Sequence, residues 1–465
     1  MAGAASSASF ADVSAEKGFN LAAVLGFATI LAFLGLTTFT RRFSVPVALI
    51  LIPIGAAVIG GWTGALGEMI SEGMIKVAPV AIMIAFAILY FSLMVDVGLF
   101  DPVIRRVLRW AGGSPAKIAV GTALITLLVA LDGDGTSTFL ITVTALLPIY
   151  RRIGMRPVVL TGIVALAAGL MNIIPWGGPT ARAMTALDMT SGDLFIPLLG
   201  PMAVGALWVI AVAWFLGRRE ARRIGTLTLD EPTINARPEG PGAMRAPETE
   251  TIAGPRIPVG RAAQAFNVIL TLVLVVILLL QLVPLQVAFA IAFALALIVN
   301  MPSWSAQQDL MKRHGGNVTM VVLMVLAAGV LTGIMSGSGM IDAIAQTLVS
   351  WVPDSAASLL PIITALTAMP LTLVMNPDAY YFGVVPVLAE TTASFGGDPA
   401  EIGRAALLGM GTTGFPISPF AAATFILLGL SDVELGRHQR YIFGWAFGTT
   451  VVMTIAALTL GVITL

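Results

Sequence analysis

The chain alternates long runs of apolar residues with short polar connections. Several runs reach the roughly 20 residues that a helix needs to cross a hydrocarbon core about 30 Å thick. We therefore predict an all-α polytopic membrane protein. Ten crossings are expected, at residues 18–40, 44–61, 76–100, 157–186, 194–217, 263–282, 285–301, 317–341, 403–430 and 440–464.

Two segments between these crossings are long enough to enter the bilayer, turn and leave on the same side. They are residues 115–150 and residues 355–390, and we predict that both are re-entrant hairpins. Such a hairpin needs protein or water around its broken backbone, because lipid cannot hydrogen-bond it. The basic residues support this topology, since most of them gather on one face, the cytoplasmic one, only if both hairpins return to their own side.

The predicted crossings divide into two sets of five with opposite orientation, an inverted repeat of the kind found in many secondary transporters. Two similar strings support the repeat: SLMVDVGLFD at 92–101 and GIMSGSGMID at 333–342. The expected organisation is an N-terminal tail at 1–17, a first repeat at 18–217, a cytoplasmic linker at 218–262 and a second repeat at 263–465.

Composition narrows the class of protein further. Hydrophobic residues make up 57% of the chain and charged residues 11%, against about a quarter charged in soluble domains, which excludes a water-soluble globule. With no cysteine, disulfides and thiol chemistry are excluded. His314 and His438 stand beside basic residues in polar connections, so we expect solvated loop histidines and not metal ligands. No nucleic-acid partner and no enzyme activity are expected.

The first hairpin carries LDGDGTSTF at 131–139. A carboxylate near the bilayer centre costs at least about 2.5 kcal/mol, so ionisable residues there usually face a cavity and have a function. Asp132 and Asp134 are therefore expected at such a cavity, in a glycine-rich turn with neighbouring hydroxyl oxygens. The alternative is an ordinary Asp-Gly surface turn in water. The second hairpin repeats the pattern with Asn376 and Asp378.

Two predicted crossings contain helix breaks. In NIIPWGGPTAR the helix cannot continue between Pro175 and Pro179, and the amides that begin the next half-helix favour an anion. Arg182 follows one turn later, and its planar guanidinium suits a carboxylate or phosphate. The alternative is an arginine paired internally with an aspartate. The second break, LGMGTTGFPISPF at 408–420, has hydroxyl groups but no arginine.

Three other features have two readings each. Asp96 closes the third crossing and is either a functional acid or a helix end at the membrane interface. Tyr380 is either a wall of the site or an interfacial anchor. Gly409, Gly411 and Gly414 form G-x-G-x-x-G, but no strand precedes them, so a nucleotide-binding turn is rejected.

The strings NIIPWGGPTARA, MNPDAYYFGVVPVLAE and LDGDGTSTF closely resemble the CitMHS family of metal-citrate:proton symporters, within the ion transporter superfamily. The resemblance covers nearly the whole chain. It implies a multi-pass carrier of the bacterial inner membrane that imports citrate complexed with a divalent metal of the Mg or Ca class, together with protons. It also implies a homodimer in membrane lipid, with a scaffold domain and a transport domain that moves like an elevator.

The residues and the resemblance together give a set of candidate roles. No resident cofactor is expected, since the metal is part of the cargo. The candidate substrate-binding residues are Asp132, Gly133, Asp134, Gly135, Thr136, Ser137, Asn172, Pro175, Gly177, Gly178, Thr180, Arg182, Asn376, Asp378, Tyr380, Thr412, Thr413 and Ser418. The candidate metal contacts are Asp132, Asp134 and Asp378, and the candidate proton carriers are Asp134, Asp378 and Asp96.

Other functions were weighed against this one. A proton symporter for a metal-free organic acid such as gluconate shares the architecture. An ion channel is disfavoured by paired halves with helix breaks. A membrane-embedded hydrolase ranks last, because no histidine is expected inside the membrane to act as a base.

Overall fold

The computed structural model describes residues 21–36, 44–133, 135–224, 257, 259–351 and 353–464. Throughout these residues the secondary structure is helical, with no strand. The predicted class, an all-α polytopic membrane protein, is confirmed. The N-terminal tail, most of the linker and Asp134 lie outside the described residues.

Six helices in the described part of the chain are long and apolar enough to span a membrane, and a pair bent by 43° at residues 399–431 makes a seventh. Helix α6 with the turn after it, Pro115–Asp132, is one of the six. Because that segment could span the bilayer by length alone, the re-entrant path of the first hairpin and the ten crossings stay predictions.

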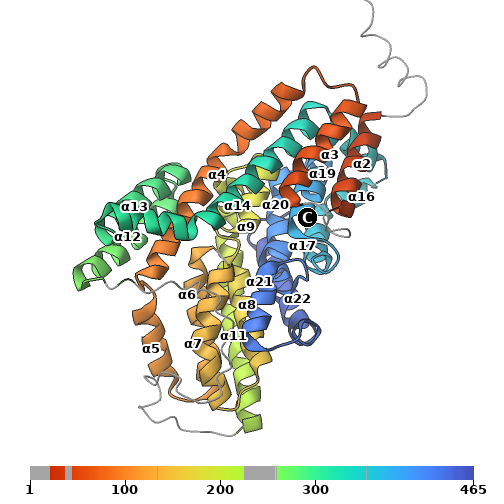
Figure 1. The fold of residues 1–465 in the computed structure, drawn as a ribbon. Helices are drawn as coiled ribbons and strands as arrows, with labels where there is room; N and C mark the ends of the chain where they lie inside the picture. Colours follow the sequence, from red (N-terminus) through yellow and green to blue (C-terminus); the bar gives the residue numbers. More distant parts are fainter. Residues whose placement is uncertain are drawn as a thin grey trace, which may run out of the picture.

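The helices form two bodies (Figure 1). In the first body, long helices α4 and α14 lie side by side and obliquely, with two helix pairs beside them. Its helices are α2 (Leu21–Leu34), α3 (Val45–Ile59), α4 (Leu66–Asp96), α12 (Arg261–Leu280), α13 (Leu285–Asn300) and α14 (Trp304–Gly337).

The second body contains both predicted hairpins and both predicted breaks. Helix α11 packs against α6 and α22, and α7 packs against α21. Its main helices are α6 (Pro115–Val129), α7 (Gly135–Arg152), α8 (Pro157–Met171), α9 (Gly178–Leu187), α11 (Leu199–Ile224), α17 (Leu360–Leu371), α19 (Val385–Ser394), α20 (Pro399–Ala406), α21 (Ala422–Ser431) and α22 (Leu435–Thr459).

Two further helices, which the sequence reading did not separate, connect the bodies. They are α5 (Asp101–Ala111) after α4 and α15 (Met340–Trp351) after α14. The turns that lead into them match, because Gly98 and Gly339 occupy equivalent positions in the two similar strings and have φ of 69° and 70°. This left-handed conformation favours glycine. The two strings therefore form the same helix–turn–helix junction.

Glycines let α4 and α14 touch through their backbones. A Cβ atom added to Gly73 would overlap the carbonyl oxygen of Gly329, and one added to Gly329 would lie 2.7 Å from the carbonyl oxygen of Gly73. Gly333 packs against the backbone of Met69 in the same way. Residues four apart share one helix face, so Gly329 and Gly333 form a small-residue stripe of the type that joins membrane helices.

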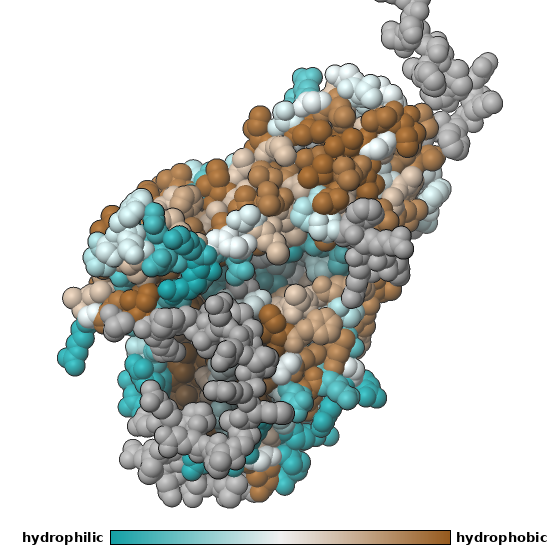
Figure 2. All heavy atoms as spheres, in the orientation of Figure 1, coloured by the Kyte–Doolittle hydropathy of each residue, from teal (hydrophilic) through white to brown (hydrophobic). Residues whose placement is uncertain are grey.

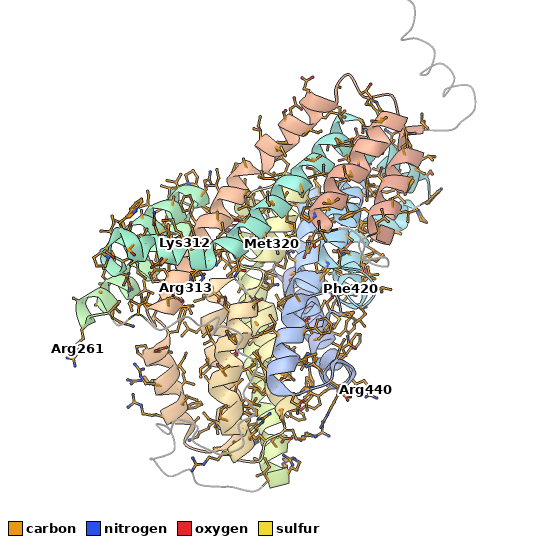
Figure 3. The ribbon with its side chains drawn as sticks, viewed as in Figure 1. Arg261, Lys312, Arg313, Met320, Phe420 and Arg440 are labelled. Carbon is orange, nitrogen blue, oxygen red and sulfur yellow. The ribbon has the colours of Figure 1, made fainter. Side chains whose placement is uncertain are left out.

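The surface agrees with a membrane setting. Figure 2 shows hydrophobic atoms over α2, α3 and much of the first body, and hydrophilic atoms at the start of α14. Lys312 and Arg313 are labelled at that place in Figure 3. The polar start of α14 thus lies where the two bodies face each other.

Candidate functional site

The tip of the first hairpin packs against both helix breaks. The indole Nε1 of Trp176, in the first break, donates a hydrogen bond to the carbonyl oxygen of Leu131 at 2.8 Å. Gly133 turns the tip with φ of 73°, and a Cβ atom there would lie 2.8 Å from the Trp176 ring. Gly135 abuts the ring of Phe415, in the second break, so closely that a Cβ atom would overlap it.

The second hairpin closes the other side of this arrangement. Asn172, before the first break, donates from Nδ2 to the carbonyl oxygen of Gly411 at 3.3 Å. A Cβ atom on Gly411 would lie 2.9 Å from the Tyr381 hydroxyl and 3.1 Å from Pro179. The first hairpin therefore packs against both breaks, and the second hairpin packs against the second break through Tyr381.

Several candidate hydroxyl groups brace the broken backbone in this conformation. Thr180 donates to the carbonyl oxygen of Ile173 at 2.7 Å, across the first break. In the second break, Thr413 donates to Ala446 O at 2.9 Å and Ser418 to Thr372 O at 3.1 Å. Thr412, in the same break, bonds within its own helix. All four side chains are buried. Thr180 thus satisfies a carbonyl freed by the first break, whereas Thr413 and Ser418 tie the second break to α22 and to the end of α17.

Pro175, Gly177 and Gly178 form the tight connection between α8 and α9. A Cβ atom on Gly177 would overlap the carbonyl oxygen of Asn172, and one on Gly178 would lie 2.7 Å from Nη1 of Arg182. Glycine is therefore required for the chain to fold back this closely, and it brings the guanidinium beside the first turn of α9.

Arg182 forms an ion pair with Asp378 of the second hairpin. Its Nε lies 2.5 Å from Oδ1 of Asp378, and the side chains are 19% and 13% exposed. Asn376 accepts from Ala379 N at 2.7 Å and so caps the short helix α18 (Pro377–Ala379) that carries the acid. The internal arginine–aspartate pair, one of the two readings of the sequence, is the state seen here.

Asp132 lies at a different place, on a cavity between the two bodies. The cavity has about 40 Å³ of room for water, and its polar walls come from Ser92, Asp96, Asp132, Ser137, His314 and Asn317. Oδ1 of Asp132 accepts from Thr138 at 3.0 Å. A cavity of this size holds a few water molecules.

The cavity also settles the position of Asp96. Its Oδ2 accepts from Nη1 of Arg313 and lies equally close, at 3.0 Å, to Nε2 of His314. With only 3% of its surface exposed, Asp96 is a buried, paired acid. Asp96 is the last residue of α4, as one of its two readings expected, and its position at the membrane interface stays a prediction.

The candidate residues thus form two groups along α14. Asp132 shares the cavity with His314, whereas Nη2 of Arg182 lies 3.9 Å from the sulfur of Met324. Met324 is ten residues beyond His314, roughly 15 Å along a helix. Ser137 and the neighbouring Thr136 belong with the first group, and Tyr380, whose buried hydroxyl has no hydrogen-bond partner in the described structure, follows Asp378 in the second.

Both histidines were misplaced by the sequence reading. His314 is part of α14 and contacts Asp96. His438 is part of α22 and fully buried, with Nδ1 3.1 Å from the Thr161 hydroxyl and Nε2 3.2 Å from the Pro416 carbonyl oxygen. His438 belongs to a helix long and apolar enough to span a membrane, so the expectation that no histidine lies in a membrane span has lost its basis. The error arose because these helices continue past their apolar runs into charged residues that look like loops.

No group of three or more histidine or acidic side chains poised to hold a metal occurs among the described residues. The cluster of His314, Arg313 and Asp96 was missed by sequence reasoning. The signal that could have found it is the spacing of His314 and Asn317, which places two polar groups on one face just before the apolar run of α14.

Replacing Trp176 by phenylalanine is expected to weaken substrate binding. The phenyl ring keeps the stack on Phe91, whose ring centroid is 5.4 Å away, but the Leu131 carbonyl loses its donor, at a cost of about 1 kcal/mol. The half-saturating concentration of the citrate cargo that the sequence resemblance implies should rise about fivefold, measured from the concentration dependence of uptake. Trp208→Phe is the matched control, because the Trp208 indole N–H has no hydrogen-bond partner among the residues that the structure describes. Equal effects of both substitutions would contradict the prediction.

Comparisons with known proteins agree with this architecture. The CitMHS family model, described as Citrate transporter, matches residues 13–409. A Bacillus subtilis (strain 168) protein named Citrate transporter is 46% identical over 95% of this chain and 99% of its own length. The Mg(2+)/citrate complex secondary transporter of the same organism is 42% identical, again over 95% and 99%.

A solved structure shows the same fold. The Alcanivorax borkumensis YdaH transporter, described as having an unusual topology, superposes with a TM-score of 0.52 at 13% identity, covering 95% of this chain and 98% of its own. Together with the family match and the apolar helices, this establishes a multi-pass membrane transporter and not an enzyme. The chain belongs to the CitMHS family of citrate transporters.

Proposed function

We propose that the protein imports citrate complexed with a divalent metal of the Mg or Ca class, coupled to protons, across the bacterial inner membrane. The family match supports citrate as cargo. A relative that is 42% identical carries the name Mg(2+)/citrate complex secondary transporter, which supports a metal complex.

The observation that carries this proposal is the ion pair between Arg182 and Asp378. Without cargo, the two charges neutralise each other in a mostly buried place, where a lone charge would be costly. A metal-citrate complex brings both a carboxylate and a cation. Arg182 can then pass to a carboxylate and Asp378 to the metal, so neither charge is left alone. Metal-free citrate would instead set its carboxylates against Asp378.

Other candidates complete the site around this pair. The amides at the start of α9 favour a carboxylate, and the buried hydroxyl of Tyr380, which has no hydrogen-bond partner among the described residues, is proposed to bond the cargo once the pair opens. Asp132 and Asp134 are proposed to face the metal in a conformation in which the first hairpin contributes to the cargo site. Fully ionised citrate with a divalent cation keeps one negative charge, which Arg182 balances. Asp96, Asp134 and Asp378 are the proposed proton carriers.

Alternating access is proposed to occur by an elevator motion of the second body against the first, within a homodimer. The two-body arrangement supports this motion, since both hairpins and both breaks belong to the second body. The backbone contact between α4 and α14 gives the first body the rigidity that a scaffold needs.

Uptake into proteoliposomes tests the proposal. Radiolabelled citrate should accumulate when the outside is acidic and Mg²⁺ or Ca²⁺ is present, with about tenfold less uptake in a chelator, a difference of about 1.4 kcal/mol. Equal uptake with the chelator would remove the metal from the proposal. Accumulation of labelled gluconate in place of citrate would establish the metal-free alternative. Proton-driven uptake retained by Asp378→Asn would exclude Asp378 as a proton carrier.

A further inference from the structure

The cavity between the two bodies places His314 and Asn317, which have no role in the proposed cargo site, beside Asp96 and Asp132, which do. Asp96 and His314 come from α4 and α14 of the first body, and Ser137 comes from α7 of the second. Because helices of both bodies supply its walls, the cavity must change shape if the bodies move against each other. A charge change on its wall would therefore alter the balance between conformations.

Among the charged groups around the cavity, the imidazole of His314 is the one whose protonation would change the net charge of the cluster near neutral pH. Asp96 and Arg313 form an ion pair at 3.0 Å, so together they carry no net charge. His314 contacts the same carboxylate oxygen through Nε2. If Nε2–H is donated to Asp96, an incoming proton binds at Nδ1, and the cluster then carries one positive charge. Imidazole is the side chain whose charge changes near neutral pH.

The wall of the cavity opposite His314 carries an acidic residue whose interaction with His314 depends on the protonation of the imidazole. Asp132 of the first hairpin lines the same cavity. Among the described residues, the charged or titratable groups that line the cavity or pair with its wall are Asp96, Asp132, Arg313 and His314. A protonated His314 attracts the acidic hairpin tip through a few water molecules, and a neutral His314 releases it. The protonation state of a first-body residue thus biases the position of a second-body hairpin.

We propose that His314, held by Asp96, is a binding site for the coupling proton and links proton uptake to the docking of the first hairpin. This inference rests on the proposed proton-coupled function and adds a residue and a place to it. Protonation favours the docked hairpin, and release of the proton permits the return movement. Ser92, Ser137 and Asn317 provide hydrogen-bonding groups for the water between the two walls.

The test uses His314→Gln in full-length protein in proteoliposomes. The glutamine amide can still donate to Asp96, but it cannot take up a proton. Net citrate uptake driven by a pH gradient should fall about tenfold, a typical size for coupling between two sites. Proton influx, followed with a trapped pH-sensitive dye, should fall in parallel. Exchange of external labelled citrate for internal citrate should persist, because exchange returns a loaded carrier and requires no proton release.

The pH profile and a neighbouring substitution complete the test. Net uptake by His314→Gln should vary less with pH than uptake by the parent. Lys312→Gln removes an exposed charge two residues earlier on the same helix, and it should match the parent in both assays. If His314→Gln does not purify as a folded protein, His314→Asn replaces it.

Two results would overturn the inference. One is parental net uptake with a parental pH profile in the variant. The other is loss of exchange together with net uptake in a folded variant, since His314 would then be needed for movement and not for the proton. If the parent itself shows citrate uptake that ignores the pH gradient, the proposed proton coupling fails, and the inference fails with it. Failure of the proposed proton coupling is distinguishable from failure of the inference about His314, because the first appears in the parent protein and the second only in the variant.

Discussion

Replacing Arg182 by alanine is expected to reduce citrate uptake about a hundredfold, because removal of one partner of a buried, hydrogen-bonded charge pair costs about 2–5 kcal/mol. In the empty carrier Asp378 loses its counter-charge, and in the loaded carrier a citrate carboxylate loses its guanidinium. Initial rates of labelled citrate uptake into proteoliposomes measure the effect. Arg440→Ala is the control, since Arg440 is exposed and its Nε donates to the carbonyl oxygen of Gly436 in its own helix, at the surface of the lower part of the molecule (Figure 3).

A double substitution separates cargo binding from a purely structural ion pair. Arg182→Ala with Asp378→Asn leaves no uncompensated charge, so the thermal stability lost in Arg182→Ala should return. Uptake should stay low, because the guanidinium that binds the carboxylate is still missing. If uptake recovers together with stability, the ion pair serves only the fold, and the proposed role of Arg182 is wrong.

The sequence located the helix breaks but not the state of the groups around them. Pro175 and Pro179 cannot lie in a continuous helix, so their position could be predicted from covalent chemistry alone. Whether Arg182 faces a ligand or an aspartate depends on where the second hairpin lies, almost 200 residues later in the chain. The residues next to Arg182 carry no information about where so distant a segment packs. The sequence therefore allows both readings, and the contact with Asp378 decides between them.

The histidines show a second kind of limit. Apolar periodicity ends a predicted helix where polar residues begin, but a helix persists when a neighbouring helix satisfies those polar groups. His314 lies within α14, where its Nε2 contacts the Asp96 carboxylate. His438 lies within α22, where the Thr161 hydroxyl and the Pro416 carbonyl oxygen are its hydrogen-bond partners. Because these partners come from distant parts of the chain, the sequence predicted loops at two positions that are helical, and it did not predict the contact between His314 and Asp96.

The contact between α4 and α14 has a partial signature in sequence. Gly329 and Gly333 are spaced by four, which marks a face suited to close helix packing. The spacing does not name the partner. Only the structure shows that Gly73 of the other half fills the contact, and that backbone meets backbone there.

The second large effect is expected at this contact, where Gly73→Val should prevent the first body from assembling. The new Cβ atom would overlap Gly329 O and lie 2.8 Å from the Cα atom of Gly333, and neither backbone atom can move without moving a helix. Overpacking of a core costs about 1–3 kcal/mol and occasionally more, and a backbone clash belongs at the upper end. Thermal unfolding in detergent, followed by size-exclusion chromatography, should show little folded protein.

Gly67→Val, six residues earlier on α4, is the matched control for this substitution. It introduces the same β-branched residue into the same helix, but nothing lies within 4 Å of its added Cβ atom. Its melting temperature should stay close to that of the parent. A Gly73→Val variant as stable as Gly67→Val would show that α4 and α14 can separate at little cost, and the first body would then lack the rigidity that an elevator scaffold requires.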